Sequence, residues 1–158
     1  MNYYLAVDIG ASSGRHILAH LENGKIILEE VHRFQNGMIN QDGHLVWDHE
    51  SLFSEIVLGM KKCKELGKIP YSMGIDTWAV DYALLDENDS LLGPIYGYRD
   101  FRTENMDQEV YRIIPEENLY KRTGIQKQPF NTIYQLMAHK MEENSVLNKA
   151  KSMLLVPD

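Results

Sequence analysis

The residues best suited to chemistry lie near the start of the chain, where one acid precedes a glycine-rich turn that ends on a cation. The acid is Asp8, the turn runs from Gly10 to Gly14, and the cation is Arg15. Small residues leave room for a bulky anion beside the backbone, and successive N–H groups of such a turn can bind it. A carboxylate at Asp8 could hold a divalent cation, directly or through water. The pattern therefore indicates a site for phosphate and a metal, and a tight hairpin turn without a ligand is the alternative.

Strands are predicted on both sides of this turn. Residues 3–9 form a short, apolar, β-branched run, which is typical of a buried strand. Residues 16–21 alternate in polarity, and Asn23-Gly24 separates them from the apolar run 26–31, which is the strongest short-range signal of a hairpin. The opening is therefore predicted as three strands in an antiparallel meander. A dinucleotide-binding loop opens a helix instead, so this context argues against a nicotinamide-dependent dehydrogenase. The sequence also lacks a P-loop pattern.

Composition narrows the kind of partner. The chain has 158 residues, and its 16 basic and 23 acidic residues give a formal net charge of −7. An acidic chain without a basic run does not suit nucleic acid or an anionic membrane surface. No apolar run reaches the roughly 18 residues of a membrane span, and no secretory signal is visible. Since Cys63 is the single cysteine, no internal disulfide is possible, and we expect a cytoplasmic location.

A second strand that ends in an acid follows a helix. Asp48 is a good N-cap, apolar residues then recur at spacings of three and four, and Gly67 is the expected stop, so a helix is predicted over 48–66. The next run, 69–76, reads as a strand that ends at Asp76. Because ligands of open α/β sheets gather at the carboxyl ends of strands, we expect Asp76 to face the same cleft as Asp8.

The rest of the chain is predicted as short alternating elements. We expect Thr103 and Asn131 to cap helices. The expected elements are strand fragments at a sheet edge over 38–39 and 45–47, a strand over 80–85, helices over 103–113, 115–119 and 131–144, a loop over 121–129, and a strand over 152–156.

Several separated stretches resemble one family, the FGGY carbohydrate kinases. The turn 8–15, in its Ala-Ser-Ser-Gly-Arg form, and the segment 74–81 are similar to the branch of this family that acts on L-rhamnulose. The other similar stretches are 32–34, 98–100, 102–103, 124–126, 129–132 and 134–136. Together they run from residue 4 to Asp158, but they correspond to the N-terminal part of a longer family chain. We therefore expect residues 1–158 to be the N-terminal domain of a longer protein.

The resemblance implies a fold and a reaction. The implied fold is α/β, with a ribonuclease-H-like (actin-like) domain whose mixed sheet opens as a three-stranded antiparallel meander and carries helices on its faces. The implied reaction transfers the γ-phosphoryl group of ATP, with Mg²⁺, to the 1-hydroxyl of L-rhamnulose and gives L-rhamnulose 1-phosphate in rhamnose catabolism. The general-base aspartate and the adenine pocket would lie beyond Asp158, in a C-terminal domain. No catalytic residue is therefore expected within these residues, and the piece alone is expected to be inactive.

The resemblance also assigns roles by position. The residues that would line the ATP phosphates are Ala11, Ser12, Ser13, Gly14 and Arg15. Phosphoryl transfer depends on positioning and on charge stabilisation, which a guanidinium at Arg15 can supply. Asp8 would hold magnesium through water, and its alternative role is to cap the glycine turn.

A second set of residues would border the sugar: Thr77, Trp78, Ala79, Asp81, Arg99 and Asp100. Trp78 would stack on an apolar sugar face and Asp81 would accept sugar hydroxyls, whereas Ala79 stands where the family usually has glycine. The alternatives are core packing for Trp78, a turn or edge-strand acid at Asp81, and an ion pair between Arg99 and Asp100.

Two other functions stay open at this point. One is a non-catalytic actin-like module that binds a sugar or a nucleotide, such as a sugar sensor in a regulator, which a DNA-binding domain should accompany. The other is a related FGGY kinase that acts on another ketose or on a polyol, since such an enzyme would share most of these motifs.

Overall fold

The contacts of the chain divide into two units. The computed structural model describes residues 1–143 and 145–158. The first unit, which we call the sheet unit, comprises Met1–Met38, Asp48–Ala79 and Pro157. The second, the helical unit, comprises Ile39–Trp47, Val80–Val156 and Asp158. Each unit is described by itself.

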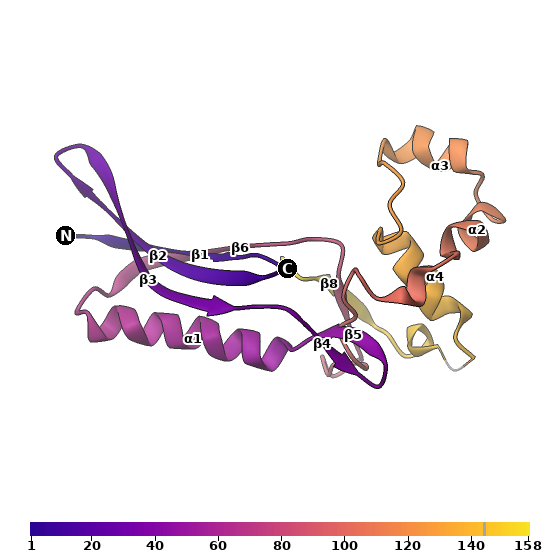
Figure 1. Cartoon of the computed structure of the whole chain (residues 1–158), viewed down its shortest axis with the longest axis horizontal. Coiled ribbons are helices and arrows are strands. Elements are labelled where there is room, and N and C mark those ends of the chain that lie inside the picture. Colours follow the sequence, from indigo (N-terminus) through magenta and orange to yellow (C-terminus); the bar gives the residue numbers. More distant parts are fainter. Residues whose placement is uncertain (144) are drawn as a thin grey trace. The chain divides into compact units, whose positions relative to one another are not determined.

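A four-stranded mixed sheet forms the sheet unit (Figure 1). Strands β1 (Tyr3–Ile9), β2 (Ser13–Glu22) and β3 (Lys25–Gln35) make an antiparallel meander, and β6 (Pro70–Thr77) pairs with β1 in parallel, which gives the order β3-β2-β1-β6. The turn between β2 and β3 has Asn23 at φ 49° and Gly24 at φ 75°. Positive φ at both central residues is the geometry that Asn-Gly favours in hairpins, so the predicted meander is confirmed.

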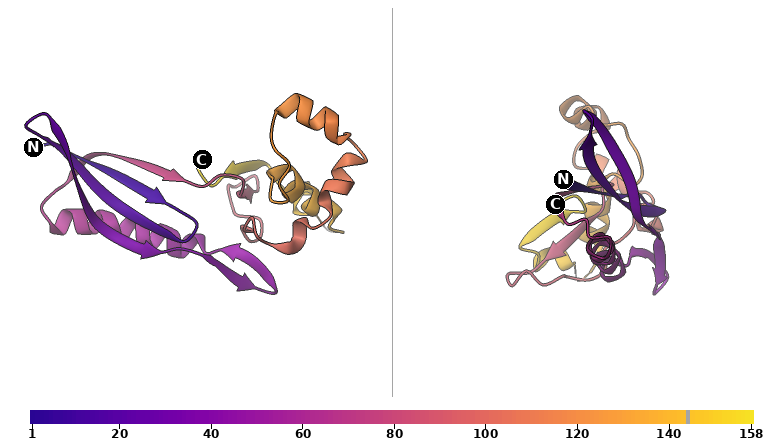
Figure 2. Two further views of the ribbon diagram at one scale, coloured as in Figure 1. Left: turned by 45° about the horizontal axis from the view of Figure 1, so that its top comes forward. Right: turned by 90° about the vertical axis from the view of Figure 1, so that its left-hand side faces the viewer.

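One long helix, α1 (His49–Glu65), covers part of this sheet. Its N-cap is Asp48, whose Oδ1 accepts a hydrogen bond of 2.9 Å from the backbone N of Ser51. The helix ends before Gly67, which lies at φ 69°, so both predicted caps are confirmed. Figures 1 and 2 show α1 running along β2 and β3. The buried apolar core beneath it contains Leu5, Val7, Ile9, Leu18, Phe34 and Cys63.

Helix α1 packs tightly against the sheet at Gly59. A Cβ atom built there would lie 2.3 Å from the ring of His16, which is fully buried. The Nε2 atom of His16 lies 3.1 Å from the backbone oxygen of Ile56, and burial lowers the pKa of this histidine. His16 is thus a packed residue between strand and helix, and its neighbour along β2, Arg15, points to the other face.

Two small sheets belong mainly to the helical unit. Strands β4 (Met38–Gln41) and β5 (His44–Trp47) pair with each other, and β7 (Tyr82–Leu85) pairs antiparallel with β8 (Ser152–Leu155). The predicted strand fragments over 38–39 and 45–47 are confirmed as β4 and β5, which form a two-stranded sheet of their own. A turn with Asp42 at φ 53° and Gly43 at φ 89° folds the two fragments into their own hairpin.

Short helices make up the rest of the helical unit. They are α2 (Met106–Tyr111), α3 (Glu116–Thr123), α4 (Thr132–Met141) and the 3₁₀ turns Phe101–Thr103 and Val146–Asn148. Thr103 does not cap α2, since it is buried and its hydroxyl donates to the backbone oxygen of Asp100 at 3.5 Å. Helix α3 extends through 121–123, where a loop was predicted. The predicted end of the last helix, Asn144, lies outside the described residues.

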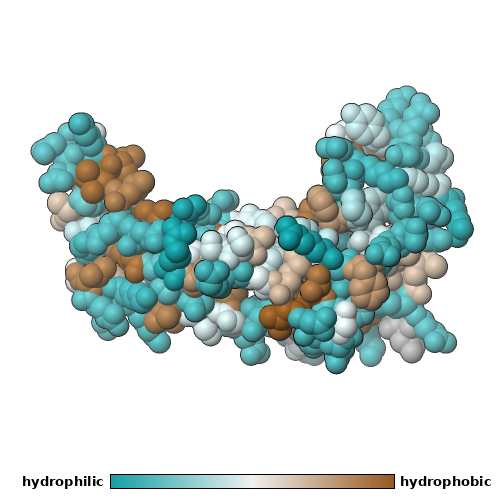
Figure 3. Space-filling view, in the orientation of Figure 1, coloured by the Kyte–Doolittle hydropathy of each residue, from teal (hydrophilic) through white to brown (hydrophobic). Residues whose placement is uncertain are grey.

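Apolar side chains gather on the surface at the tip of the β2–β3 hairpin (Figure 3). Leu21 is 64% exposed, Ile26 69% and Leu28 65%. In the part of the chain that the structure describes, no helix is both long and apolar enough to cross a membrane.

Candidate functional site

The glycine turn that joins β1 to β2 is held from outside by Asn36. Within the turn, the backbone N of Gly10 donates to the oxygen of Ser13 at 2.9 Å. Asn36, just after β3, donates from Nδ2 to the oxygen of Gly10 at 2.8 Å and from its backbone N to the oxygen of Ser12 at 3.0 Å. In the sequence Asn36 precedes Gly37, and such a pair indicates only a turn. Its distance of more than twenty positions from Gly10 hides this role from any local pattern.

The turn also depends on a close packing contact at Gly14. A Cβ atom at this position would lie 2.1 Å from Cζ of the buried Phe34 ring. Ser12 is exposed and Ser13 half-buried, and within the described residues neither hydroxyl makes a hydrogen bond. The turn thus has a fixed backbone and hydroxyl groups that remain available to a ligand.

Asp8 and Arg15 face each other across the β1–β2 ladder. They are in-register partners, and Nε and Nη2 of Arg15 lie 2.9 and 2.8 Å from Oδ2 of Asp8. Both side chains are nearly half exposed, at 44% for Asp8 and 45% for Arg15. Arg15, the cation predicted to bind phosphate, and Asp8, the predicted metal ligand, are therefore neighbours, and a ligand can reach both.

Asp76 stands on the other side of Asp8. The two aspartates are in-register partners on the parallel strands β1 and β6, so their side chains lie on the same face, near the carboxyl ends of both strands. Asp76 is exposed, and its register with Asp8 places the two acids side by side, while the expectation that they face one cleft stays a prediction. Sequence reasoning did not include Asp76 among the site residues.

This donor set suits a magnesium ion that arrives with phosphate. Among the described residues, no group of three or more His, Cys, Asp or Glu side chains could hold a metal by itself. Magnesium usually keeps several waters and binds through one or two carboxylates together with substrate phosphates. Asp8 and Asp76 meet that requirement without forming a cage of protein ligands.

The sheet unit also holds the first predicted sugar residues, at the end of β6. Thr77 is the last residue of the strand, and its buried hydroxyl has no hydrogen-bond partner among the described residues. Trp78 is half-buried and packs against the core of the sheet unit, as its alternative role requires. Ala79 is exposed. The predicted sugar contacts of these residues stay predictions.

Asp81, in the helical unit, is fully buried. Its Oδ2 accepts from Nε1 of Trp47 at 2.7 Å and from the backbone N of Tyr98 at 3.2 Å, and its Oδ1 accepts from Nε2 of Gln135 at 2.9 Å. A carboxylate in this position has no exposed oxygen to offer a sugar. The geometry therefore favours the alternative role of Asp81, as an acid that stabilises a turn, over direct contact with sugar hydroxyls.

Asp100 is buried as well, and it organises the turn after residue 97. Its side chain is 1% exposed and accepts from the backbone N of Leu45 at 2.7 Å and from that of Arg102 at 3.0 Å, with Nδ1 of His44 at 3.1 Å. Arg99 is exposed, with its guanidinium 5.4 Å from the ring centre of Tyr98. In the described part of the chain Arg99 and Asp100 do not pair, which leaves the cation of Arg99 accessible.

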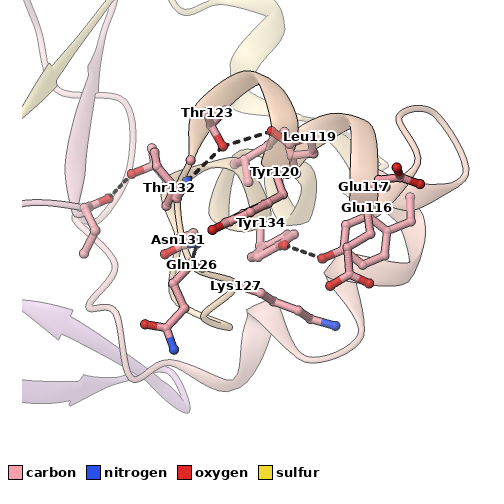
Figure 4. A pocket seen from close by; sticks show the side chains of 15 residues that line it. Glu116, Glu117, Leu119, Tyr120, Thr123, Gln126, Lys127, Asn131, Thr132 and Tyr134 are labelled. Atoms are coloured by element: carbon pink, nitrogen blue, oxygen red, sulfur yellow. Dashed lines mark hydrogen bonds between the residues drawn. The ribbon is translucent and has the colours of Figure 1, made fainter.

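The helical unit contains a pocket of about 1010 Å³ between α3, α4 and the loop that joins them (Figure 4). The hydroxyls of Tyr111 and Tyr134 are hydrogen-bonded at 2.9 Å in its wall, and Glu116 and Glu117 lie at the start of α3. None of the predicted site residues lines this pocket, and sequence reasoning had no signal for it, since the wall comes from three separate segments.

Comparison with known proteins places the chain in a family. Residues 3–158 match the N-terminal domain of the FGGY family of carbohydrate kinases. The rhamnulokinase of Halalkalibacterium halodurans is 55% identical over 158 residues, which are all of this chain and 34% of that protein. The rhamnulokinase of Bacillus subtilis is 44% identical over 155 residues, which cover 98% of this chain and 31% of that protein. The chain thus spans about a third of the length of the curated relatives that it matches.

Solved structures agree on the fold. A xylulose kinase from Lactobacillus acidophilus superposes with a TM-score of 0.80 at 18% identity and covers 97% of this chain and 31% of its own. Glycerol kinase from Plasmodium falciparum gives a TM-score of 0.72 at 16% identity, with 94% of this chain and 30% of its own covered. FGGY-type sugar kinases have the actin-like ribonuclease-H fold, so the predicted α/β class is confirmed. The family model matches residues 3–158, and the solved structure of a xylulose kinase covers 97% of the chain. The chain therefore belongs to the FGGY family of carbohydrate kinases and corresponds to their N-terminal domain.

Proposed function

We propose that this chain is the N-terminal part of an ATP-dependent kinase that phosphorylates the 1-hydroxyl of L-rhamnulose, with Mg²⁺, to L-rhamnulose 1-phosphate in rhamnose catabolism. The observation that carries the phosphoryl-transfer part is the row Asp76, Asp8 and Arg15 beside an open glycine turn. The choice of sugar is supported by 44–55% identity to proteins named rhamnulokinase, at full or nearly full coverage of this chain.

In this proposal the turn 11–15 binds the ATP phosphates. Its free hydroxyls and the half-exposed Arg15 offer donors to phosphate oxygens, and its backbone is already fixed by Asn36. Asp8 and Asp76 would hold magnesium through water, which neutralises charge that develops on the transferring phosphoryl group. Arg15 would leave Asp8 for phosphate when the ligand arrives.

Residues 77–79 of the sheet unit would contact the sugar, and Arg99 of the helical unit stays a predicted sugar residue. Thr77 has a buried hydroxyl without a hydrogen-bond partner among the described residues, and Trp78 would offer an apolar ring face. Ala79 would narrow the sugar site by one methyl group where the family usually has glycine. Asp81 and Asp100 are both buried within the helical unit and would not touch the sugar.

The remainder of the reaction requires the rest of the protein. A general base and an adenine pocket are expected in a C-terminal domain, and the relatives are about three times as long as this chain. Without them the base is missing and water is not excluded. The free, buried Cys63 suits a reducing compartment, so we propose a cytoplasmic enzyme.

A coupled assay of ADP release tests this function. The full-length protein is expected to turn over L-rhamnulose with a kcat/KM at least about tenfold above those for D-xylulose and glycerol, while residues 1–158 alone give no sugar-dependent ADP. A higher kcat/KM for another ketose or a polyol would overturn the choice of sugar. Binding of L-rhamnulose without any ATP consumption would favour the sensor instead, and turnover by residues 1–158 alone would show that the base lies within them.

A further inference from the structure

We propose that Thr132 and Gln135, on helix α4, are positioning residues that hold the backbone at Val80 and the carboxylate of Asp81 in the conformation that the sugar segment 77–81 requires. The inference rests on the proposed sugar site but adds residues that no motif identified. Neither side chain needs to touch the sugar. Both act on Val80 and Asp81, the two residues of this segment that belong to the helical unit.

Val80 has a strained backbone. Its φ is +71°, which β-branched residues rarely adopt because Cβ crowds the neighbouring carbonyl. Such strain is unfavourable and persists only where surrounding contacts impose it. The residue follows Ala79 and precedes Asp81 directly, so the strain lies inside the predicted sugar segment.

The contacts that impose the strain come from α4. The oxygen of Val80 accepts a hydrogen bond of 2.8 Å from Oγ1 of Thr132 and one of 3.3 Å from Nε2 of Gln135. The same Nε2 donates to Oδ1 of Asp81 at 2.9 Å and to the oxygen of Phe130 at 3.1 Å. One side-chain amide thus binds the backbone of Val80 and the side chain of the next residue at once.

Arg102 fixes the orientation of that amide. Its Nη2 donates to Oε1 of Gln135 at 3.0 Å, and its Nη1 donates to the backbone oxygen of the same residue at 3.1 Å. Because a guanidinium can only donate, Oε1 must face Arg102 and the NH₂ group must face Val80 and Asp81. Gln135 is 1% exposed, so water does not compete for these bonds.

Steady-state kinetics of the full-length protein tests the inference. Thr132→Val and Gln135→Met keep the size of each side chain and remove its donor. Each is expected to raise KM for L-rhamnulose about fivefold or more, because Val80 and Asp81 continue the sugar segment directly. KM for ATP is expected to stay within about twofold, since among the described residues no hydrogen bond joins Thr132 or Gln135 to the phosphate turn. Thr132→Ser keeps the hydroxyl and is expected to stay near the parent.

Tyr111→Phe is the matched control. It removes a hydrogen bond of 2.9 Å to Tyr134 in the same unit and leaves Val80 and Asp81 untouched, so both KM values are expected to stay at the parent level. Folded Thr132→Val and Gln135→Met variants with the parent KM for sugar would overturn the proposal. An equal rise of KM for L-rhamnulose in Tyr111→Phe would also overturn it, because the effect would then come from destabilisation of the helical unit as a whole.

A crystal structure of Thr132→Val separates this inference from the proposed function. Val80 is expected to leave the left-handed region once its oxygen loses the shorter bond. Val80 at positive φ in both the Thr132→Val and the Gln135→Met structures would show that α4 does not impose the strain, which would overturn the proposal. This measurement decides the matter even if the full-length protein does not phosphorylate L-rhamnulose.

Discussion

Arg15 binds Asp8 through two nitrogens that meet the same carboxylate oxygen, at 2.9 and 2.8 Å. The two residues that phosphate and magnesium would need are thus paired with each other before either ligand arrives. In the proposed function an incoming phosphate would take Arg15 from Asp8, and a magnesium ion would replace the lost positive charge beside the acid. Such an exchange would link the binding of the two ligands.

Asp8→Asn is expected to uncouple ATP binding from magnesium in the full-length protein. Loss of the carboxylate charge removes repulsion of the phosphates, worth about 1 kcal/mol at 4 Å in water, so metal-free ATP should bind about fivefold more tightly. The gain in affinity on adding Mg²⁺ should shrink. Titration calorimetry with and without EDTA measures both, with Glu30→Gln on β3 as the control acid. An unchanged magnesium effect in Asp8→Asn would remove Asp8 from the metal site.

Arg15→Ala is expected to weaken ATP binding by about tenfold or more, since a hydrogen bond to a charged group contributes about 1.5–3 kcal/mol. The free energy of unfolding should change by less than about 1 kcal/mol, because the ion pair with Asp8 is exposed. Arg33→Ala is the matched control: this exposed arginine is the in-register partner of Arg15 on β3 and pairs with Glu30. Equal loss of ATP affinity in both variants would point to net charge alone.

Gly14→Ala is expected to destabilise the sheet unit by about 1–3 kcal/mol, because the new methyl group would have to displace the buried ring of Phe34. Gly37→Ala tests the same chemical change in open space, where nothing lies within 4 Å, and should stay within about 0.5 kcal/mol of the parent. Urea unfolding followed by circular dichroism compares the two. A loss of the same size in both would mean that contact with the Phe34 ring does not set the cost, since the lower backbone entropy of the unfolded alanine variants would by itself stabilise the fold.

Acidification is expected to lower the stability of both units. Burial is the main cause that lowers the pKa of His16 and of His139 in the folded chain below the ordinary value of 6.5. Below that pH the two histidines bind protons in the unfolded chain but remain neutral in the folded chain. The free energy of unfolding therefore falls, by at most about 1.4 kcal/mol per pH unit for each histidine. Above it both states are neutral and the stability is retained.

Denaturant unfolding between about pH 7.5 and 5.5 measures this decline. His139→Gln should show a smaller decline, since the amide takes up no proton, and His49→Gln, at the exposed start of α1, serves as the control. Stability that rises as the pH falls would show that the buried histidines gain a charge partner on folding.

Local patterns were sufficient for the sheet unit. Asn23-Gly24, Asp48 and Gly67 each act on the backbone within a few residues, so their effect can be predicted from neighbours alone. The alternation of apolar residues in β1 likewise specifies which face is buried, and that places Asp8 on the open one.

The rest of the candidate site depends on contacts between distant residues. Asp81 looks like an accessible acid in the sequence, and only the folded chain brings Trp47 and Gln135 to its two oxygens. Asn36 reads as one more turn residue until β3 carries it beside Gly10. Strain at Val80 is also invisible in the sequence, because valine normally indicates extended backbone.

The outer edge of β6 has a practical consequence. Among the described residues this strand pairs with β1 alone, and on the face that carries the core Met73 and Ile75 are 43% and 50% exposed. Unpaired backbone groups beside apolar side chains are a template for another strand. In a concentrated solution of residues 1–158, a strand of one molecule can therefore pair with the free edge of β6 in another. The protein concentration at which light scattering rises measures how readily the molecules associate through this edge.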